Sequence, residues 1–281
     1  MAASMSDLVT DLAAETEVIE QMLAGLPDAE WDRPTPAEGW LIRDQISHLA
    51  YFDEAAVTAV LDPERFLAEA KAQMAQGMDF PDKLAAEHRS LPVPELHAWF
   101  RRARLALITE TGERDPKERV PWYGPAMSLA SCVTARIMET WAHGQDVADA
   151  LGLTREPSAR LKHVAHIGVG ARAYSFMVRG LDVPEEPIRV ELVAPDGSAW
   201  TWGPEDAADR ITGDALDFCL LVTQRRHRDE TKLVITGPVA DAWMSVAQAF
   251  AGAAGPGRPA PVGCASARRR PPDSGGLRNA D

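Results

Sequence analysis

The stretches EGWLIRDQISHL (residues 38–49) and METWAHGQD (residues 138–146) carry the signals that decide this fold. Both fall inside long amphipathic patterns, so we expect each of them on a helix. Glu139 and His143 are four residues apart and therefore lie one helical turn apart on the same face. With His48 they offer two imidazoles and one carboxylate, a ligand set suited to Zn²⁺ or another divalent metal with one position left open.

Four long amphipathic patterns contain or flank these stretches. The first runs from Met5 to the break at Pro27, and the others cover residues 41–61, 94–113 and 128–151. Residues 63–90 are less regular and predict a short helix and a loop, while residues 116–125 read as a loop. Long amphipathic helices with connections of varied length predict a four-helix bundle, which we assign to residues 1–155.

The pattern changes after residue 156. Alternating segments at residues 188–193, 199–202 and 232–236 predict strands, and a Pro-Asp-Gly turn at 195–197 joins the first two. Helical patterns cover residues 159–178, 216–222 and 239–250. This mixture predicts a smaller α+β domain over residues 156–254, which makes the chain α+β overall. Residues 255–281 are rich in Gly, Pro and Arg and predict a disordered tail.

Composition narrows the class of function. The chain has 281 residues, a net charge of −13 and a pI near 5.0, which argues against a nucleic-acid partner or an anionic membrane. Basic residues cluster only in the short islands 225–228 and 268–270. The three cysteines form no CxxC motif, and no signal peptide or long apolar run is visible. We therefore expect a soluble, cytoplasmic protein without disulfides.

Each candidate ligand also has an ordinary structural interpretation. A Glu-x-x-x-His pair fits a surface ion pair on a helix as well as it fits two metal ligands. The carboxylates Asp44 and Asp146 lie near the histidines in sequence and are candidates for orienting them. His88 and His97 are in helical patterns but lack a motif, and Trp122-Tyr123-Gly124 is a loop that either packs or lines a pocket mouth.

The surrounding motifs resemble those of a known family. The run Gly-Trp-x-x-x-Asp-x-x-x-His-Leu at residues 39–49, combined with Trp-x-His-x-x-Asp at 141–146, resembles the DinB-like superfamily and, more closely, its mycothiol-dependent maleylpyruvate isomerase branch. The resemblance implies an up-down four-helix bundle. It also implies one metal held by a histidine of the second helix and a Glu-x-x-x-His pair of the fourth, at positions matching His48, Glu139 and His143.

The same resemblance implies a reaction and a cationic residue. A low-molecular-weight thiol such as mycothiol adds to a small electrophilic substrate, so the expected partners are that substrate and the thiol, and the protein is a monomer or homodimer. The family's arginine, in a Thr-Gly-Arg context, matches Arg225 here. Gln224 stands in place of the glycine, the adjacent Arg226 is a second candidate, and a basic helix end that balances the helix dipole is the structural alternative.

The residues leave three functions open. The first is an isomerase or thiol transferase that uses the metal and the thiol. The second keeps the metal but uses bound water, as a hydrolase or dehydratase. The third is a non-catalytic module that binds a metal or small ligand, because one fold hosts many functions. The sequence also leaves Zn²⁺, Ni²⁺ and Fe²⁺ open as the metal.

Overall fold

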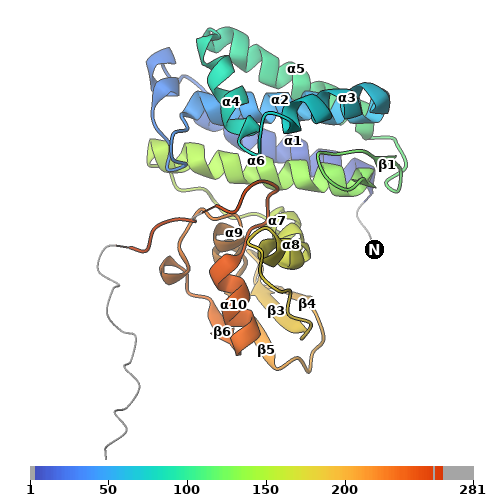
Figure 1. The fold of residues 1–281 in the computed structure, drawn as a ribbon. Coiled ribbons are helices and arrows are strands. Elements are labelled where there is room, and N and C mark those ends of the chain that lie inside the picture. The colour runs from blue at the N-terminus through green and yellow to red at the C-terminus, as the bar shows by residue number, and fades with distance from the viewer. Residues whose placement is uncertain (1–3, 256, 262–281) are drawn as a thin grey trace, which may run out of the picture.

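The computed structural model describes residues 4–255 and 257–261 as a helical bundle joined to a smaller domain with a sheet (Figure 1). The long bundle helices are α1 (Met5–Leu23), α2 (Ile42–Leu61), α5 (Val93–Thr111) and α6 (Leu129–Leu151). Helices α1 and α2 each pack against both α5 and α6. Helices α1 and α2 therefore lie diagonally across the bundle, as do α5 and α6, whereas α2 and α5 are neighbours.

The connections contain short elements that the sequence only partly revealed. They are the 3-10 turns η1 (Asp28–Asp32) and η2 (His88–Ser90), the helices α3 (Pro63–Met74) and α4 (Phe80–Glu87), and the hairpin β1 (Arg119–Val120) with β2 (Met127–Ser128). The prediction of one short helix in residues 63–90 was wrong, because two form there. Asp62 caps the first of them at the amide of Arg65, and Gly77, with φ +112°, separates it from the second.

Local signals fix the ends of the two helices that carry the candidate ligands. At the start of α2 the Leu41 amide donates to Asp44 Oδ2 over 2.8 Å. At the start of α6 the Ser131 amide donates to Ser128 Oγ over 3.1 Å. Gly152 then ends α6 in the left-handed conformation, with φ 69°. These contacts define where α2 begins and where α6 begins and ends.

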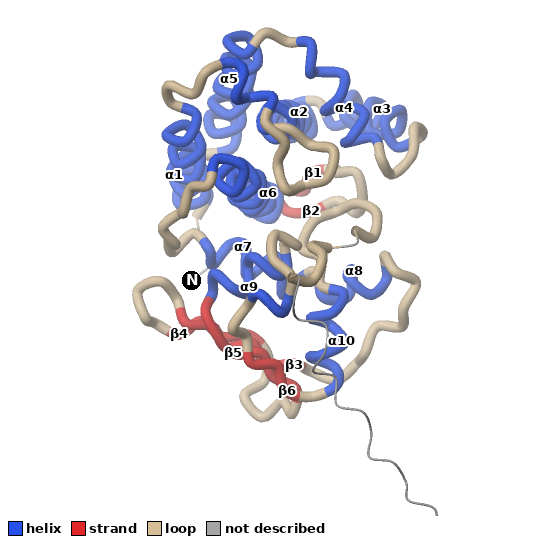
Figure 2. Tube along the Cα trace, turned by 90° about the vertical axis from the view of Figure 1, so that its left-hand side faces the viewer, coloured by secondary structure: helices blue, strands red, loops and turns tan. Residues whose placement is uncertain are grey.

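The second domain is a four-stranded mixed sheet with helices on one face (Figure 2). Its strands are β3 (Ile188–Val193), β4 (Ala199–Trp202), β5 (Asp209–Asp214) and β6 (Val234–Thr236), in the order β4-β3-β5-β6 with β3 and β5 parallel. Its helices are α7 (Leu161–Gly170), α8 (Arg172–Met177), α9 (Ala215–Val222) and α10 (Pro238–Val246), with the 3-10 turn η3 (Arg228–Glu230). The α+β fold class is confirmed.

Three predictions for this domain were wrong in detail. The helix predicted over 159–178 is two helices, because the chain leaves helical geometry at Ala171. Strand β5 lies in the middle of the sheet, but the sequence did not predict it. Its only large apolar residue is Ile211, which is too few for an alternating pattern. The last helix ends at Val246 instead of continuing to residue 250. In the first four residues of each central strand, β3 and β5, buried side chains alternate with half-buried ones.

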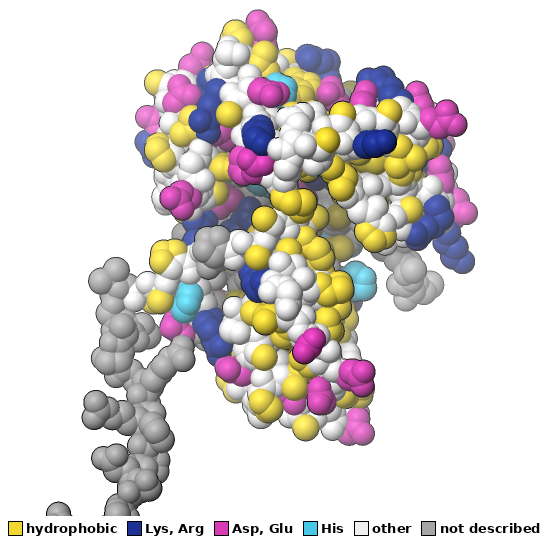
Figure 3. Space-filling model, viewed as in Figure 1, with side chains coloured by type: hydrophobic (Ala, Val, Ile, Leu, Met, Phe, Trp, Pro, Cys, Tyr) yellow, Lys and Arg dark blue, Asp and Glu magenta, His cyan; other side chains and the backbone are white. Residues whose placement is uncertain are grey.

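Helix α6 is shared by the two hydrophobic cores. Its residues Val133 and Ile137 lie in a bundle core with α1 and α2, while Met138, Trp141 and Ala142 pack into the core of the second domain. In the space-filling view the second domain meets the bundle along a narrower waist (Figure 3). The helix that carries Glu139 and His143 is therefore held from both sides. Within the described residues, no helix is long and apolar enough to cross a membrane.

Candidate metal centre

The structure brings His48, Glu139 and His143 together from two helices. One donor atom from each lies within 4.8 Å of the other two. The distances to Glu139 Oε2 are 3.1 Å from His143 Nε2 and 3.6 Å from His48 Nε2. The imidazole rings of the two histidines are 4.3 Å apart, measured between centroids. Two imidazole nitrogens and a carboxylate oxygen thus converge on one point, as the sequence motif predicted.

A hydrogen-bonded chain fixes the orientation of His143. Its Nδ1 lies 2.5 Å from Gln45 Oε1, and Gln45 Nε2 donates to Thr35 Oγ1 over 3.0 Å. The Thr35 hydroxyl donates in turn to the Trp40 carbonyl over 2.9 Å. Because the amide nitrogen of Gln45 already has an acceptor, its oxygen faces His143 and must receive a proton from Nδ1. A neutral His143 therefore presents the lone pair of Nε2 to the centre.

These residues fit a metal ion. A neutral His143 would direct its Nε2 lone pair at Glu139 Oε2, and two lone pairs repel unless a cation lies between them. The contact of His143 Nδ1 with Gln45 fits this interpretation, because metal-binding histidines in proteins usually donate their second ring N–H to an acceptor. The donor set of two nitrogens and one oxygen matches catalytic Zn²⁺ sites that keep a fourth position open.

The surroundings of His48 and Glu139 shift the pKa values of both groups toward their metal-binding forms. Burial and the adjacent His143 lower the pKa of His48 to about 3, so its imidazole is neutral. Burial alone would raise the pKa of Glu139. The adjacent imidazoles of His143 and His48 outweigh that effect and hold the pKa of Glu139 well below its usual value, so the carboxyl is ionised. Neutral imidazole and ionised carboxylate are the forms that bind metals.

Aromatic rings surround the two histidines. Trp40 stacks on His143 with centroids 5.8 Å apart and meets His48 edge-on at 5.4 Å. Phe52 lies 4.5 Å from His48 on the other side. Tyr123, from the loop before α6, packs on Phe52 at 5.5 Å, so that loop joins the aromatic cluster beside the centre. These rings exclude water from part of the site and strengthen its electrostatics.

Asp44 and Asp146, the candidates for orienting the histidines, bind arginines instead, so the prediction that they orient the histidines was wrong. Asp44 accepts hydrogen bonds from Arg89 Nε and Nη2 and from the Leu41 amide. Asp146 accepts from Arg225 and Arg258. Within the described residues, neither carboxylate is hydrogen-bonded to His48 or His143. The amide of Gln45 takes that role for His143, and no pattern in the sequence indicated it.

The candidate cation reaches α6 close to the site. Arg225 Nη2 donates to Asp146 Oδ2 over 2.7 Å, and Asp146 follows His143 by one helical turn. Arg226 instead forms a two-pronged pair with Asp149, a further turn away, at 2.6 and 2.8 Å. The geometry thus puts the guanidinium of Arg225 nearer the ligand residues along α6, while its catalytic role stays a prediction.

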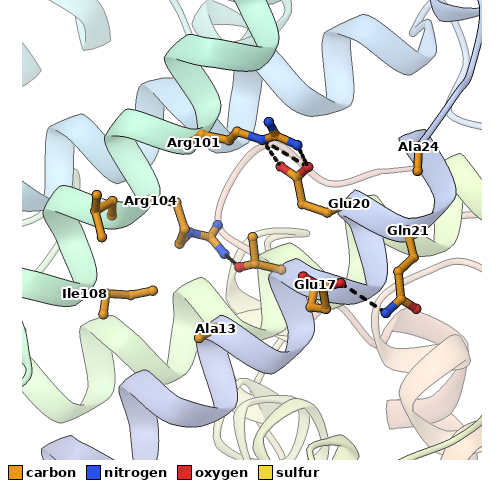
Figure 4. A pocket seen from close by; sticks show the side chains of 10 residues that line it. Ala13, Glu17, Glu20, Gln21, Ala24, Arg101, Arg104 and Ile108 are labelled. Carbon is orange, nitrogen blue, oxygen red and sulfur yellow. Dashed lines mark hydrogen bonds and ion pairs between the residues drawn. The ribbon is translucent and has the colours of Figure 1, made fainter.

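The other sequence candidates lie elsewhere. His97 Nε2 is 2.9 Å from Glu20 Oε2, and His88 Nδ1 contacts the Leu84 carbonyl. A surface cavity of about 480 Å³ opens between α1 and α5, where Arg101 and Glu20 pair across it (Figure 4). None of the three clustered ligand residues lines that cavity. It is separate from the candidate metal centre.

Two family models and two curated proteins match this chain. Residues 12–148 match the family model described as mycothiol maleylpyruvate isomerase N-terminal domain, and residues 184–234 match one described as wyosine base formation. Two uncharacterized proteins of Mycobacterium tuberculosis, from strains CDC 1551 / Oshkosh and ATCC 25618 / H37Rv, are each 45% identical over 256 residues, which cover 91% of this chain and 100% of theirs.

Solved structures share the fold of this chain. Crystal structures of a mycothiol-dependent maleylpyruvate isomerase and of its histidine-to-alanine mutant share the fold, with a TM-score of 0.57 and 17% or 16% identity, over 84% of this chain and 97% of theirs. Fold and site together define a DinB-like bundle with a second domain. The chain belongs to the same family as these mycobacterial proteins, and its residues 12–148 match the mycothiol maleylpyruvate isomerase N-terminal domain.

Proposed function

We propose that this protein is a divalent-metal-dependent enzyme that uses a low-molecular-weight thiol, of the mycothiol type, on a small electrophilic substrate. The observation that carries the proposal is the convergence of His48, Glu139 and His143, with the Nδ1 proton of His143 directed to Gln45. Zn²⁺ is the metal that this set of donors suits best. The family match and the isomerase fold support the thiol chemistry over the other uses of such a site.

The chain's own residues bind and orient the reactants. Three protein donors leave at least one position for a small ligand, and Trp40 and Phe52 limit the access of water. When bound there, a divalent metal supplies the positive charge that keeps a thiol deprotonated near neutral pH. We assign Arg225 to the acidic group or polarised carbonyl of the substrate, since it matches the family's arginine by position and reaches α6 one turn from His143.

The test combines metal, thiol and electrophile. Protein loaded with Zn²⁺ is incubated with mycothiol and small substrates that contain a conjugated double bond, beginning with maleylpyruvate, and products are followed by mass spectrometry. An isomerised product with the thiol regenerated identifies an isomerase, and a stable thiol adduct identifies a transferase. Turnover without added thiol would overturn the thiol step in favour of a hydrolase or dehydratase. If the protein binds the metal but no mixture reacts, the result would overturn the enzyme proposal in favour of a non-catalytic binding module.

A matched pair of variants tests the cation. Arg225→Ala should lower kcat/KM by about 100-fold, the order found when one charge-stabilising donor is removed from an active site. Arg226→Ala is the control, since it removes the neighbouring guanidinium, which pairs with Asp149 instead. Equal losses in both variants would contradict the assignment of Arg225.

The proposal also covers partners and location. We propose that the protein acts on small molecules in the cytoplasm, as a monomer or homodimer, and binds neither nucleic acid nor membranes. The net charge of −13 supports the absence of nucleic-acid and anionic membrane partners, because a surface that binds phosphates requires a concentration of basic residues.

A further inference from the structure

The segment after α10 returns to the bundle. It consists of residues 247–255 and 257–261, and Figure 1 shows it, at the red end of the colour scale, running between the two domains. Backbone and side-chain contacts fasten its first part to the second domain: Ala249 N–H to the Val222 carbonyl at 2.8 Å, Gly252 N–H to the Tyr174 hydroxyl at 2.9 Å, and Arg179 Nη2 to the Gly255 carbonyl at 3.1 Å.

Beyond that anchor, Arg258 crosses to the bundle. Its Nη2 donates to Asp146 Oδ1 over 2.9 Å, and its Nη1 donates to the carbonyl of Pro36. The side chain is largely buried, with 15% of its surface exposed, and Asp146 is 1% exposed. The other oxygen of Asp146 already accepts from Arg225 at 2.7 Å. One guanidinium therefore joins α6 to the loop before α2.

That loop forms one wall of the candidate metal centre. Residues 33–41 close on themselves through Thr35 N–H to the Trp40 carbonyl at 2.8 Å and Ile42 N–H to the Arg33 carbonyl at 3.1 Å. The loop supplies Trp40, which stacks on His143, and Thr35, which holds Gln45 in register with His143. Arg258 thus contacts Pro36, which is next to Thr35, and Asp146, which is one turn from His143.

We propose that Arg258 is a positioning residue of the metal centre, which holds the wall formed by residues 33–41 against α6 from the C-terminal segment. The metal part of this role rests on the proposed function, whereas the contact itself does not. A charge-assisted hydrogen bond to a backbone carbonyl is stronger than a neutral one, so its loss should free the loop more than the loss of an ordinary contact. Asp146 keeps Arg225 as a partner, so the change is not expected to unfold the protein.

Hydrogen–deuterium exchange of the metal-free full chain tests the contact. In Arg258→Ala the amides of Thr35, Trp40 and Ile42 should exchange about tenfold faster than in the unaltered protein, the change expected from one such bond. Arg258→Lys keeps the charge and should restore part of the protection. Arg228→Ala is the matched control, because Arg228 pairs with Asp241 on α10 and should leave this loop unchanged.

The outcomes are separable from those for the proposed function. Unchanged exchange of residues 33–42 in Arg258→Ala, or an equal increase in Arg228→Ala, would overturn the positioning role. In protein loaded with Zn²⁺, Arg258→Ala should also release the metal to EDTA faster than Arg228→Ala does, while the melting temperatures of the two variants stay alike. A protein that binds no Zn²⁺ would refute the metal centre, and the exchange experiment on the metal-free chain would still decide the role of Arg258.

Discussion

At the scale of single residues, the candidate metal centre depends on how His143 is oriented. His143 has an acceptor for its Nδ1 proton in Gln45, and its Nε2 faces Glu139. Such an arrangement selects one tautomer and aims one lone pair. The ligand positions themselves were predictable because helical spacing puts Glu139 and His143 on one face. The role of Gln45 was not predictable, since a buried amide leaves no periodic signal and its partner, His143, is 98 residues away.

Replacing Gln45 tests the held tautomer. Gln45→Ala removes the acceptor of His143 Nδ1 and should weaken Zn²⁺ binding by about 10- to 100-fold, the usual cost of losing such a contact. Isothermal titration calorimetry with Zn²⁺ measures the effect. Gln21→Ala, an exposed position on α1, is the control and should bind like the unaltered protein. An unchanged affinity in Gln45→Ala would mean that the contact does not orient a ligand.

At the scale of elements, a buried ion cluster joins three bundle helices beside the metal centre. Asp53 on α2 accepts from Arg104 on α5 over 2.6 Å and from Arg136 on α6 over 3.0 Å. All three side chains are at least 97% buried, since Asp53 is 0% exposed and each arginine 3%. One carboxylate shared by two guanidiniums fixes the rotation of the helices. This cluster was not predicted, because charged residues on amphipathic helices are normally read as solvent-facing.

Removing that carboxylate should be costly. Asp53→Ala leaves two buried guanidiniums without their counter-ion and should lower the free energy of unfolding by about 3–5 kcal/mol, as found when one member of a buried ion pair is deleted. Urea unfolding monitored by circular dichroism measures the change. Asp241→Ala, which breaks the pair of a 63% exposed carboxylate with Arg228, should cost less than about 1 kcal/mol. Similar losses in both variants would show that the cluster contributes nothing particular.

At the scale of the whole molecule, the two domains meet through arginine–carboxylate pairs along α1 and α6. Glu15 pairs with Arg160, Asp146 with Arg225, and Asp149 with Arg226. The sequence revealed the helical N-terminal region and the α+β class, because these follow from periodicity. It did not reveal which charges meet across the junction, since such pairs join distant parts of the chain and have no local pattern.

The junction should weaken in acid. Burial tends to raise the pKa of Asp149, but hydrogen bonds from Arg226 and Gln145 outweigh it and lower the pKa below the usual value. The carboxylate therefore contributes stability above the pKa of the unfolded group, about 3.9, and that contribution is lost as the pH falls through the lower folded value.

Variants at two aspartates measure this loss. The urea midpoint of Asp149→Asn should fall below that of the unaltered protein near neutral pH, and the difference should shrink once the pH drops below about 4. Asp182→Asn, at an exposed position between the strands and α8, is the control and should follow the unaltered protein throughout. A difference between Asp149→Asn and the unaltered protein that stays constant down to the lowest pH would contradict the ion pair.

The central claim is that His48, Glu139 and His143 hold one divalent metal. The most direct measurement is elemental analysis of the purified full chain by inductively coupled plasma mass spectrometry after exposure to Zn²⁺ and removal of the excess. We predict about one equivalent of metal per chain, and at least tenfold less in His48→Ala and in His143→Ala. His166→Ala, at an exposed histidine outside the centre, should retain the full equivalent. A folded, unaltered protein without metal, or full occupancy in His143→Ala, would contradict the claim.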